Sequence, residues 1–533
     1  SFYGRHAMER NFQRSRVLHG SYVIGSRRGV SSHQYNPAVI LAGRDTTEDT
    51  GKCYGMVFVY SGNFMCEAEN DQFGQTRVVM GIHTDLFHYP LDKGQELVIP
   101  ETILSYSDQG FGKLSKQYHN CIREHLCRGK YKDQIRPLLI NSWEASYFDF
   151  TGETILNLAK GAAELGIDMV VMDDGWFGKR DDDNSGLGDW QANEKKLGCT
   201  LKELTDKVNS YGLKFGIWIE PEMISEDSTL YREHPDYVMQ IPGRKPVRGR
   251  NQLALDFSRK EVRDYVFSQI CNVFDQANIE YVKWDLNRSL SDIYSLENYQ
   301  GKVIYDYVLG VYEFLEKLLN RYPDILIESC SGGGGRFDAG MMYYSPQIWC
   351  SDNTDAVDRV RIQYGTSFFY PVSTMGAHVS AVPNHQTGRC VSLHTRGIVA
   401  MAGTFGYELD PAKLSDKERE EIKEQIREYK KYAELIQKGD YYRLSDPFHD
   451  PYGAWMYVSK DGQQILTHIV ILENHGNMPV IYVRMKGLEP DAVYEDMDTG
   501  RCYYGADLME AGMPMPSVME EYPAYQIAFR KRE

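Results

Sequence analysis

The sequence predicts an α/β protein built on a (β/α)8 TIM barrel, with a partial N-terminal β-sandwich and a C-terminal β-sandwich domain. Between residues 135 and 438 a pattern of strand, loop and helix repeats, as parallel βα units require. Eight candidate strands occur in this stretch, which is the number that closes such a barrel. On both sides of it the sequence consists of short β-type runs separated by turn residues.

The first 110 residues contain three clear β-type runs, Tyr54–Tyr60, Arg77–Ile82 and Glu96–Ile99. We expect residues 1–110 to be the C-terminal part of an N-terminal β-sandwich domain. Residues 111–134 have a helical pattern and predict a linker. The chain opens at Ser1 without Met, so we expect a missing upstream segment, and a lost signal peptide is compatible with the sequence.

Residues 135–438 are predicted to form the catalytic barrel, of about 300 residues where ~250 is typical, with the excess in the loops that follow the strands. Its expected strands are Pro137–Trp143, Asp168–Asp173, Lys214–Glu220, Tyr281–Asp285, Ile325–Ser329, Gln347–Ser351, Val372–Ala377 and Gly403–Tyr407. Helices are expected at Glu153–Leu165, Leu201–Ser210, Lys260–Gln276, Tyr305–Arg321 and Ser415–Gln437. Residues 439–533 return to β-runs and predict a C-terminal antiparallel β-sandwich.

Composition excludes several kinds of partner. A net charge of -16 and a pI near 5.4 argue against nucleic acid or an anionic membrane as the main partner. No run approaches the roughly 18 to 20 apolar residues of a membrane helix. The 10 cysteines show no paired zinc-type spacing, which is typical of the reduced thiols of a cytoplasmic protein.

The stretch Tyr281–Asn287 ends a predicted strand in an unusual way. Lys283, Asp285 and Asn287 stand at alternate positions, so their side chains project to one side and converge on one small volume. Such a group suits polyol recognition and carboxylate chemistry. For this strand alone, a buried ion pair that satisfies itself is an equal alternative.

Other predicted strands end in the same manner. In a (β/α)8 barrel the carboxyl ends of all strands share one face, where active sites lie. Acids and tryptophans dominate these ends, which is typical of a cleft that cleaves glycosides with two carboxylates and binds sugars on ring faces. The residues concerned are Trp143, Asp173, Asp174, Trp176, Trp218, Glu220, Glu222, Cys330, Gly332, Asp352 and Asp355.

Several polar groups have simpler explanations. We interpret the run Asp181–Asp183 as a solvated loop rather than a metal site. The loop Ser331–Gly335 lacks a following Gly-Lys-Ser/Thr, so it favours close backbone approach to a ligand over phosphate binding. The three histidines His378, His385 and His394 are too widely spaced for a metal-binding helix and are taken as structural. Glu220 and Glu222 remain rival catalytic acids, placed second because Pro221 distorts the strand end between them.

Five segments in order resemble glycoside hydrolase family 36, specifically its bacterial α-galactosidases. They are MDDGWF (172–177), GIWIEPEM (216–223), KWDLN (283–287), ESCSGGGGRFD (328–338) and WCSDNTDAVDR (349–359). The resemblance implies that Asp285 is the nucleophile and Asp352 the acid/base. It also implies that Asp173 and Asp174 hold the 4- and 6-hydroxyls of galactose. Trp218, Arg250, Lys283, Asn287, Cys330 and Gly332 are then expected to complete the sugar subsite, with Trp143 beside them.

The expected activity is that of a retaining exo-α-galactosidase acting on oligosaccharides such as raffinose, melibiose and stachyose by double displacement. We expect Asp285 to be ionised and Asp352 to hold its proton, with no metal and no cofactor. The related bacterial enzymes look tetrameric, so the full-length protein is expected to be a homo-oligomer, specifically a tetramer. Two alternatives keep the site, an α-N-acetylgalactosaminidase and a galactosyl transferase. A catalytically silent galactoside-binding protein is disfavoured because both aspartates are present.

Overall fold

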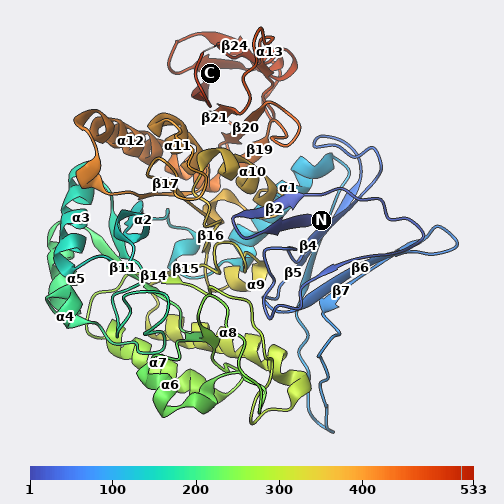
Figure 1. The fold of residues 1–533 in the computed structure, drawn as a ribbon. Helices are drawn as coiled ribbons and strands as arrows, with labels where there is room; N and C mark the ends of the chain where they lie inside the picture. Colours follow the sequence, from blue (N-terminus) through green and yellow to red (C-terminus); the bar gives the residue numbers. More distant parts are fainter. Residues whose placement is uncertain (518, 533) are drawn as a thin grey trace.

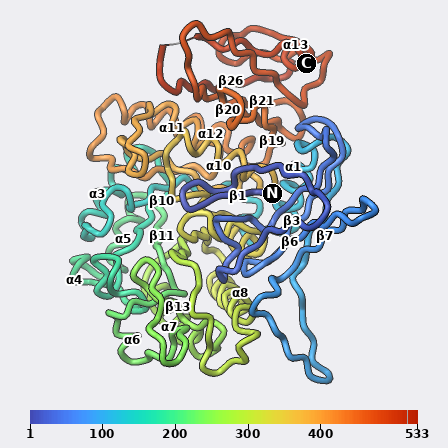
Figure 2. Tube along the Cα trace, turned by 45° about the vertical axis from the view of Figure 1, so that its right-hand side comes forward, coloured from blue at the N-terminus to red at the C-terminus, as the bar shows by residue number. Residues whose placement is uncertain are grey.

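A computed structural model describes residues 1–517 and 519–532, and the three predicted sheet-containing regions follow one another along the chain (Figure 1). The parallel barrel lies in the middle. Two N-terminal sheets pack on one side of it, and the C-terminal sheet lies across one end (Figures 1 and 2). Among the described residues, no helix has both the length and the apolar character needed to cross a membrane.

The predicted barrel is confirmed: eight parallel strands form a closed sheet in which β18 pairs with β9. Every strand is short and buried, so the hydrophobic interior rather than strand length fixes the register. The strands are β9 (Leu139–Asn141), β10 (Met169–Met172), β11 (Lys214–Ile219), β14 (Tyr281–Trp284), β15 (Leu326–Ser329), β16 (Gln347–Trp349), β17 (Met375–Ser380) and β18 (Thr404–Glu408).

All eight expected strands differ from the observed ones by at least one residue at their ends, and the differences at β17 and β9 have a clear local cause. Residues 372–374 form a 3-10 turn after Pro371, closed by the bond from Thr374 N to the Pro371 carbonyl, so β17 begins three residues later than expected. Trp143 lies outside β9 and begins the short helix α2 (Trp143–Ser146). In both places a local turn ends the extended backbone that the apolar pattern suggested.

Helices cover the outside of the barrel, and several of them begin at side-chain caps. Ser415 with Glu418, and Thr200 with Glu203, form capping boxes that start α12 and α5. The long helices are α3 (Gly152–Leu165), α5 (Leu201–Ser210), α7 (Lys260–Phe274), α8 (Val303–Arg321), α10 (Ala356–Thr366), α11 (Leu393–Ala400) and α12 (Asp416–Lys438). Between β15 and β16 the chain forms only α9 (Ala339–Met342), a single turn.

The N-terminal region packs against this short crossover. It contains the hairpin β1 (Phe2–Arg5) and β2 (Met8–Phe12), the sheet β3 (Gly20–Gly25), β6 (Phe64–Asn70), β7 (Thr76–Ile82), and the sheet β4 (Ala38–Ala42), β5 (Cys53–Phe58), β8 (Thr102–Ser107). Ser31 and Ser61 each donate to a different oxygen of buried Asp338, at 2.6 and 2.7 Å, and Asn36 donates to the Phe337 carbonyl. Helix α1 (Gly110–Cys121) then leads to the barrel.

The C-terminal region is a six-stranded antiparallel sheet in the order β19, β20, β21, β26, β23, β24. Its strands are Asp440–Arg443, Tyr452–Val458, Gln464–Ile471, Ala524–Lys531, Val493–Asp496 and Cys502–Tyr504. A two-stranded sheet of β22 (Tyr482–Val483) and β25 (Met513–Pro514) accompanies it. The sheet contacts the barrel helices through His394, whose Nε2 lies 3.2 Å from the Ala524 carbonyl.

Candidate active site

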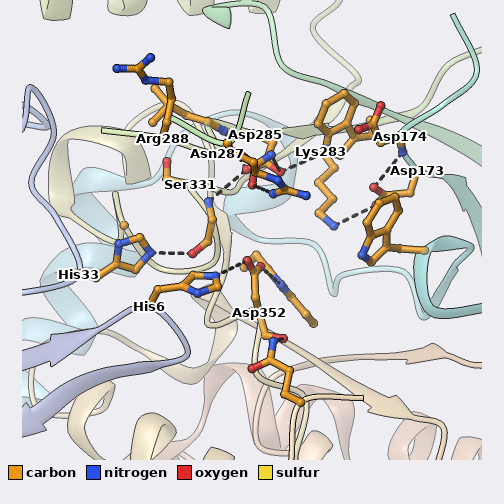
Figure 3. Close-up of a pocket in the computed structure, with 18 of the residues that line it drawn as sticks. His6, His33, Asp173, Asp174, Lys283, Asp285, Asn287, Arg288, Ser331 and Asp352 are labelled. Atoms are coloured by element: carbon orange, nitrogen blue, oxygen red, sulfur yellow. Dashed lines mark hydrogen bonds and ion pairs between the residues drawn. The ribbon is translucent and has the colours of Figure 1, made fainter. Parts of the chain in front are cut away.

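A cavity of about 450 Å³ opens at the carboxyl ends of the barrel strands. It collects almost all the residues that the sequence singled out, drawn from loops far apart in the chain (Figure 3). Those that line it are Trp143, Asp173, Asp174, Trp218, Arg250, Lys283, Asp285, Asn287, Gly332 and Asp352. Of the residues that the family resemblance assigned to catalysis or to the sugar subsite, all of which lie in the described part of the chain, Cys330 alone does not line it.

Asp285 is held by four neutral N–H donors. Trp218 Nε1 and Asn287 Nδ2 donate to its Oδ2 at 3.1 and 2.7 Å. The backbone N–H groups of Leu286 and Gly332 donate to Oδ1 at 2.7 and 3.2 Å. Gly332 has φ +50°, a conformation that glycine adopts without steric cost, and this lets its backbone approach the carboxylate. The side chain is therefore fixed in one orientation at the floor of the cavity.

Asp352 has a different environment. Trp349 Nε1 donates to Oδ1 at 3.1 Å, and Oδ2 lies 2.9 Å from His6 Nε2 (Figure 3). Burial raises the pKa of Asp352, but the hydrogen bond and charge of His6, with Lys283 and Arg250, outweigh this and hold the pKa below its ordinary value. This differs from the expectation that Asp352 holds a proton, because no histidine stands near Asp352 in the sequence to indicate this contact.

Asp173 and Asp174 lie side by side with separate cations. Lys283 Nζ is 2.9 Å from Asp173 Oδ2, and Arg180 makes a bidentate contact with Asp174 through Nε and Nη2. Burial lowers the pKa of Lys283, yet the charges of Asp173 and other acids raise it well above its ordinary value, so the amine is charged. Asn141 also donates to Asp173 at 2.7 Å. Burial raises the pKa of Asp174, and the charge and hydrogen bonds of Arg180 oppose that rise. Both acids therefore present acceptors in fixed positions to the cavity.

Arg250 enters from the loop before β13 (Leu253–Ala254). It and Asn251 both have positive φ, +47° and +59°, a strained turn that brings the guanidinium to the cavity. Its Nη1 donates to Asn287 Oδ1 at 2.5 Å, and Nη2 lies 3.6 Å from Asp183. Asp183 also lies 3.5 Å from Arg180. The expected solvated loop is thus wrong for Asp183, which forms part of the charge network around the site.

The rival acids Glu220 and Glu222 are fully buried and are not among the described cavity-lining residues. Glu220 accepts bonds from the backbone and side chain of Asn287 and from Gln252 Nε2. Burial, and then the charge of Asp285, raise the pKa of Glu220 to about 8, so it is mostly neutral at pH 7. Its position behind Asn287 supports that side chain rather than a substrate.

Glu222 is a structural anchor. Arg336 donates to both of its oxygens, at 2.7 and 3.1 Å. Trp284 Nε1 and Tyr307 Oη donate as well, at 2.8 and 2.7 Å. These bonds tie the segment after β11 to the glycine-rich loop after β15 and to α8. Glu222 thus fixes the backbone around Gly332 from the buried side, away from the cavity.

Two other predicted residues lie apart from the cavity. Burial, then the charges of Asp285 and Asp352, raise the pKa of Cys330 well above its ordinary value, so the side chain is a thiol next to the carboxylates. Asp355, the residue three positions after Asp352, accepts from the Val357 and Asp358 N–H groups as the cap of α10 and pairs with Arg389. Asp355 is therefore a helix cap.

The sequence analysis missed a second pair of acidic residues in the cavity. Glu144 and Glu408 both line it, with His385 Nδ1 3.4 Å from Glu144 and His378 Nδ1 3.2 Å from Glu408. Burial raises the pKa of Glu144 to about 7, with His385 opposing and Glu408 adding to the rise. His385 is therefore a cavity residue rather than only a structural one. Glu408 directly follows the predicted end of the eighth strand, which is the one signal that could have revealed it.

A carboxylate pair within a polar cavity at the carboxyl face of a (β/α)8 barrel is the arrangement of the glycoside hydrolases. Three sequence profiles match the chain in succession: Glycosyl hydrolase family 36 N-terminal domain over residues 1–92, Melibiase over residues 97–439, and Glycosyl hydrolase family 36 C-terminal domain over residues 452–529. The chain belongs to glycoside hydrolase family 36.

Similar proteins are known from bacteria. The chain is 66% identical over 528 residues to the bifunctional α-galactosidase/sucrose kinase AgaSK of Mediterraneibacter gnavus, a match that covers 99% of this chain and 56% of that protein. It is 50% identical over 516 residues to the α-galactosidase AgaA of Geobacillus stearothermophilus, covering 96% and 71%. The chain thus spans little more than half of AgaSK.

Solved structures agree closely with the fold. The galactosidase domain of AgaSK matches with a TM-score of 0.98 at 66% identity, covering 100% of this chain and 73% of that one. A variant of AgaA in complex with raffinose also matches with a TM-score of 0.98, at 48% identity, covering 100% and 74%.

Glu222→Ala is expected to destabilise the protein without touching the cavity wall, because it leaves the buried Arg336 guanidinium unpaired. Breaking a buried pair in this way costs about 3–5 kcal/mol. Calorimetry should show a melting temperature lower by several degrees. The exposed Glu233, changed to Ala, is the matched control and should stay within about 0.5 kcal/mol of the parent. Equal melting temperatures for both variants would contradict the anchoring role.

Proposed function

We propose that this chain is a retaining exo-α-galactosidase that removes terminal α-linked galactose from oligosaccharides such as raffinose, melibiose and stachyose. The observation that carries the proposal is the joint presence of Asp285, Asp352 and the Asp173–Asp174 pair in one cavity. The names of the relatives support it, as do structures of AgaA variants in complex with raffinose and with stachyose.

In this proposal Asp285 attacks the anomeric carbon while Asp352 delivers a proton to the leaving oxygen. The four N–H donors around Asp285, two on each oxygen, hold the carboxylate in one orientation, so attack requires no reorientation of this side chain. Formation of the ester removes the negative charge of Asp285. The pKa of Asp352 then falls further, and its carboxylate accepts a proton from the water that completes hydrolysis.

The choice of galactose over glucose depends on the axial 4-hydroxyl. Asp173 and Asp174 are buried charged acceptors, and a hydrogen bond to a charged group is worth roughly 1.5–3 kcal/mol. Ion pairs with Lys283 and Arg180 hold the two carboxyl groups in fixed positions. An equatorial hydroxyl would leave these acceptors without a partner, which a site of this kind penalises strongly.

Hydrolysis of a panel of nitrophenyl glycosides tests the substrate class. The α-galactoside should be cleaved at least about 10⁴-fold more efficiently than the α-glucoside, because the buried acids demand the axial hydroxyl. Preference for the α-N-acetylgalactosaminide would indicate the alternative hydrolase. Dominant transfer to an added sugar acceptor would indicate a galactosyl transferase. No cleavage of any α-galactoside would refute the proposed function.

Asp285→Ala should lose several orders of magnitude in kcat because no carboxylate remains to form the ester. With nitrophenyl α-galactoside and added azide, the variant should yield β-galactosyl azide, since azide fits the space that the carboxylate occupied and attacks the same face. Product configuration is read by NMR. Turnover close to that of the parent, or an azide product of α configuration, would remove Asp285 from the nucleophile role.

Asp352→Ala should slow raffinose far more than nitrophenyl α-galactoside, because only a poor leaving group needs a proton. General acid catalysis contributes about 10²–10⁴-fold. The ratio of kcat/KM values on the two substrates is the measurement. Asp355→Asn is the matched control, since it keeps a capping oxygen for α10. If the control rather than Asp352→Ala showed the leaving-group dependence, the two roles would be exchanged.

A further inference from the structure

The turn between β1 and β2 brings a histidine to the mouth of the cavity. His6 Nε2 lies 2.9 Å from Asp352 Oδ2 although the two residues are 346 positions apart (Figure 3). The His6 side chain is 57% exposed and that of Asp352 27%, so the contact lies where the cavity opens to solvent. His33 lies beside it, with its ring 5.5 Å from that of His6 and its Nε2 2.6 Å from the Gly332 carbonyl.

The hairpin is anchored firmly enough to fix this contact. Glu9 is fully buried and accepts a bond of 2.6 Å from Ser351 Oγ, the side chain immediately before Asp352. Arg10 is also buried, donates to Thr366 Oγ1 at 2.6 Å and contacts the Cys350 carbonyl. The turn and the Asp352 loop therefore form one unit, and the position of His6 does not depend on its own bond to Asp352.

The charges around the pair favour a protonated His6. The hydrogen bond that His6 donates to Asp352 raises the pKa of His6 most, burial opposes it, the charges of Asp352 and Glu9 add to the rise, and Arg250 lowers it. From the other side, Asp352 faces His6, Lys283 and Arg250. The proton shared by the pair therefore lies on the imidazole rather than on the carboxyl.

We propose that His6 is the positioning residue that stores the catalytic proton for Asp352, an inference that rests on the proposed acid/base role of Asp352. As the leaving oxygen gains negative charge, the His6 Nε2–H bond breaks and an Asp352 O–H bond forms. The Asp352 O–H bond then breaks as the leaving oxygen takes the proton, and His6 is left neutral. In the second half, the proton that Asp352 removes from water returns to His6, so the cycle balances.

The consequence is measurable in the basic limb of the pH profile. In the parent this limb reports the loss of the one proton shared by His6 and Asp352, whose pKa lies above the ordinary histidine value of 6.5. In His6→Gln the amide can still donate to Asp352 but cannot store a proton, and the carboxyl alone must hold it. The basic limb of kcat/KM on raffinose should therefore move to lower pH by about one unit or more. At pH values above the limb, this shift lowers kcat/KM by about tenfold.

Three comparisons complete the experiment. His6→Gln should lower kcat less on nitrophenyl α-galactoside than on raffinose, because the nitrophenolate leaving group needs little proton donation. His33→Gln, from the same rim but without contact to Asp352, should leave the limb in place on both substrates. If His6→Gln kept the basic limb of the parent and only its KM increased, the proposal would be overturned. His6 would then only line the mouth of the substrate-binding cavity.

Asp352→Ala, measured in parallel, separates the two possible failures. If this variant loses the basic limb while His6→Gln keeps it unchanged, Asp352 remains the acid/base and the role of His6 is refuted. If the limb persists in Asp352→Ala, another group supplies the proton, so the assignment of Asp352 fails and the inference about His6 fails with it. If Asp352→Ala loses the basic limb and His6→Gln shifts it, the result supports both the acid/base role of Asp352 and the proton-storing role of His6.

Discussion

The need to compensate buried charge organises this active site. Carboxylates crowd the carboxyl ends of the barrel strands, and moving each one out of water costs several kcal/mol unless a partner replaces the solvent. Lys283 forms an ion pair with Asp173, Arg180 with Asp174, and Arg336 with Glu222. Each cation comes from a different strand or loop, so the pairs also lock neighbouring loops together. Rigid charged acceptors for a sugar are a consequence of the same bonds.

Asp285 is stabilised in another way. Among the described residues, Asp285 makes no ion pair, and its hydrogen-bond partners are neutral: the N–H groups of Trp218, Asn287, Leu286 and Gly332, and the thiol of Cys330. In the proposed mechanism this side chain loses its charge when it becomes an ester. A cation in direct contact would then be left buried and unpaired, at considerable cost. Neutral donors avoid that cost, since they can still donate to ester oxygens.

The sequence predicted the floor of the site well because its signals are local. Lys283, Asp285 and Asn287 follow one another at strand spacing, and the barrel brings equivalent strand ends together. The surrounding residues could not be predicted in this way. Arg180 and Asp183 belong to a loop whose composition suggests solvent, and His6 reaches Asp352 only through the packing of a separate region. A pKa depends on such partners, which explains why the expected protonation of Asp352 differed.

The N-terminal region is part of the catalytic unit for a reason found in the barrel itself. Between β15 and β16 the single turn α9 replaces the long helix that usually covers this side, and the N-terminal sheets pack there. Burial raises the pKa of Asp338, at the start of α9, to about 6, and Ser31 and Ser61 oppose that rise with their hydrogen bonds. Without these serines the carboxyl would be buried with fewer donors. The packing that satisfies Asp338 also places the β1–β2 turn over the cavity, so the covering of the barrel and the environment of Asp352 are determined together.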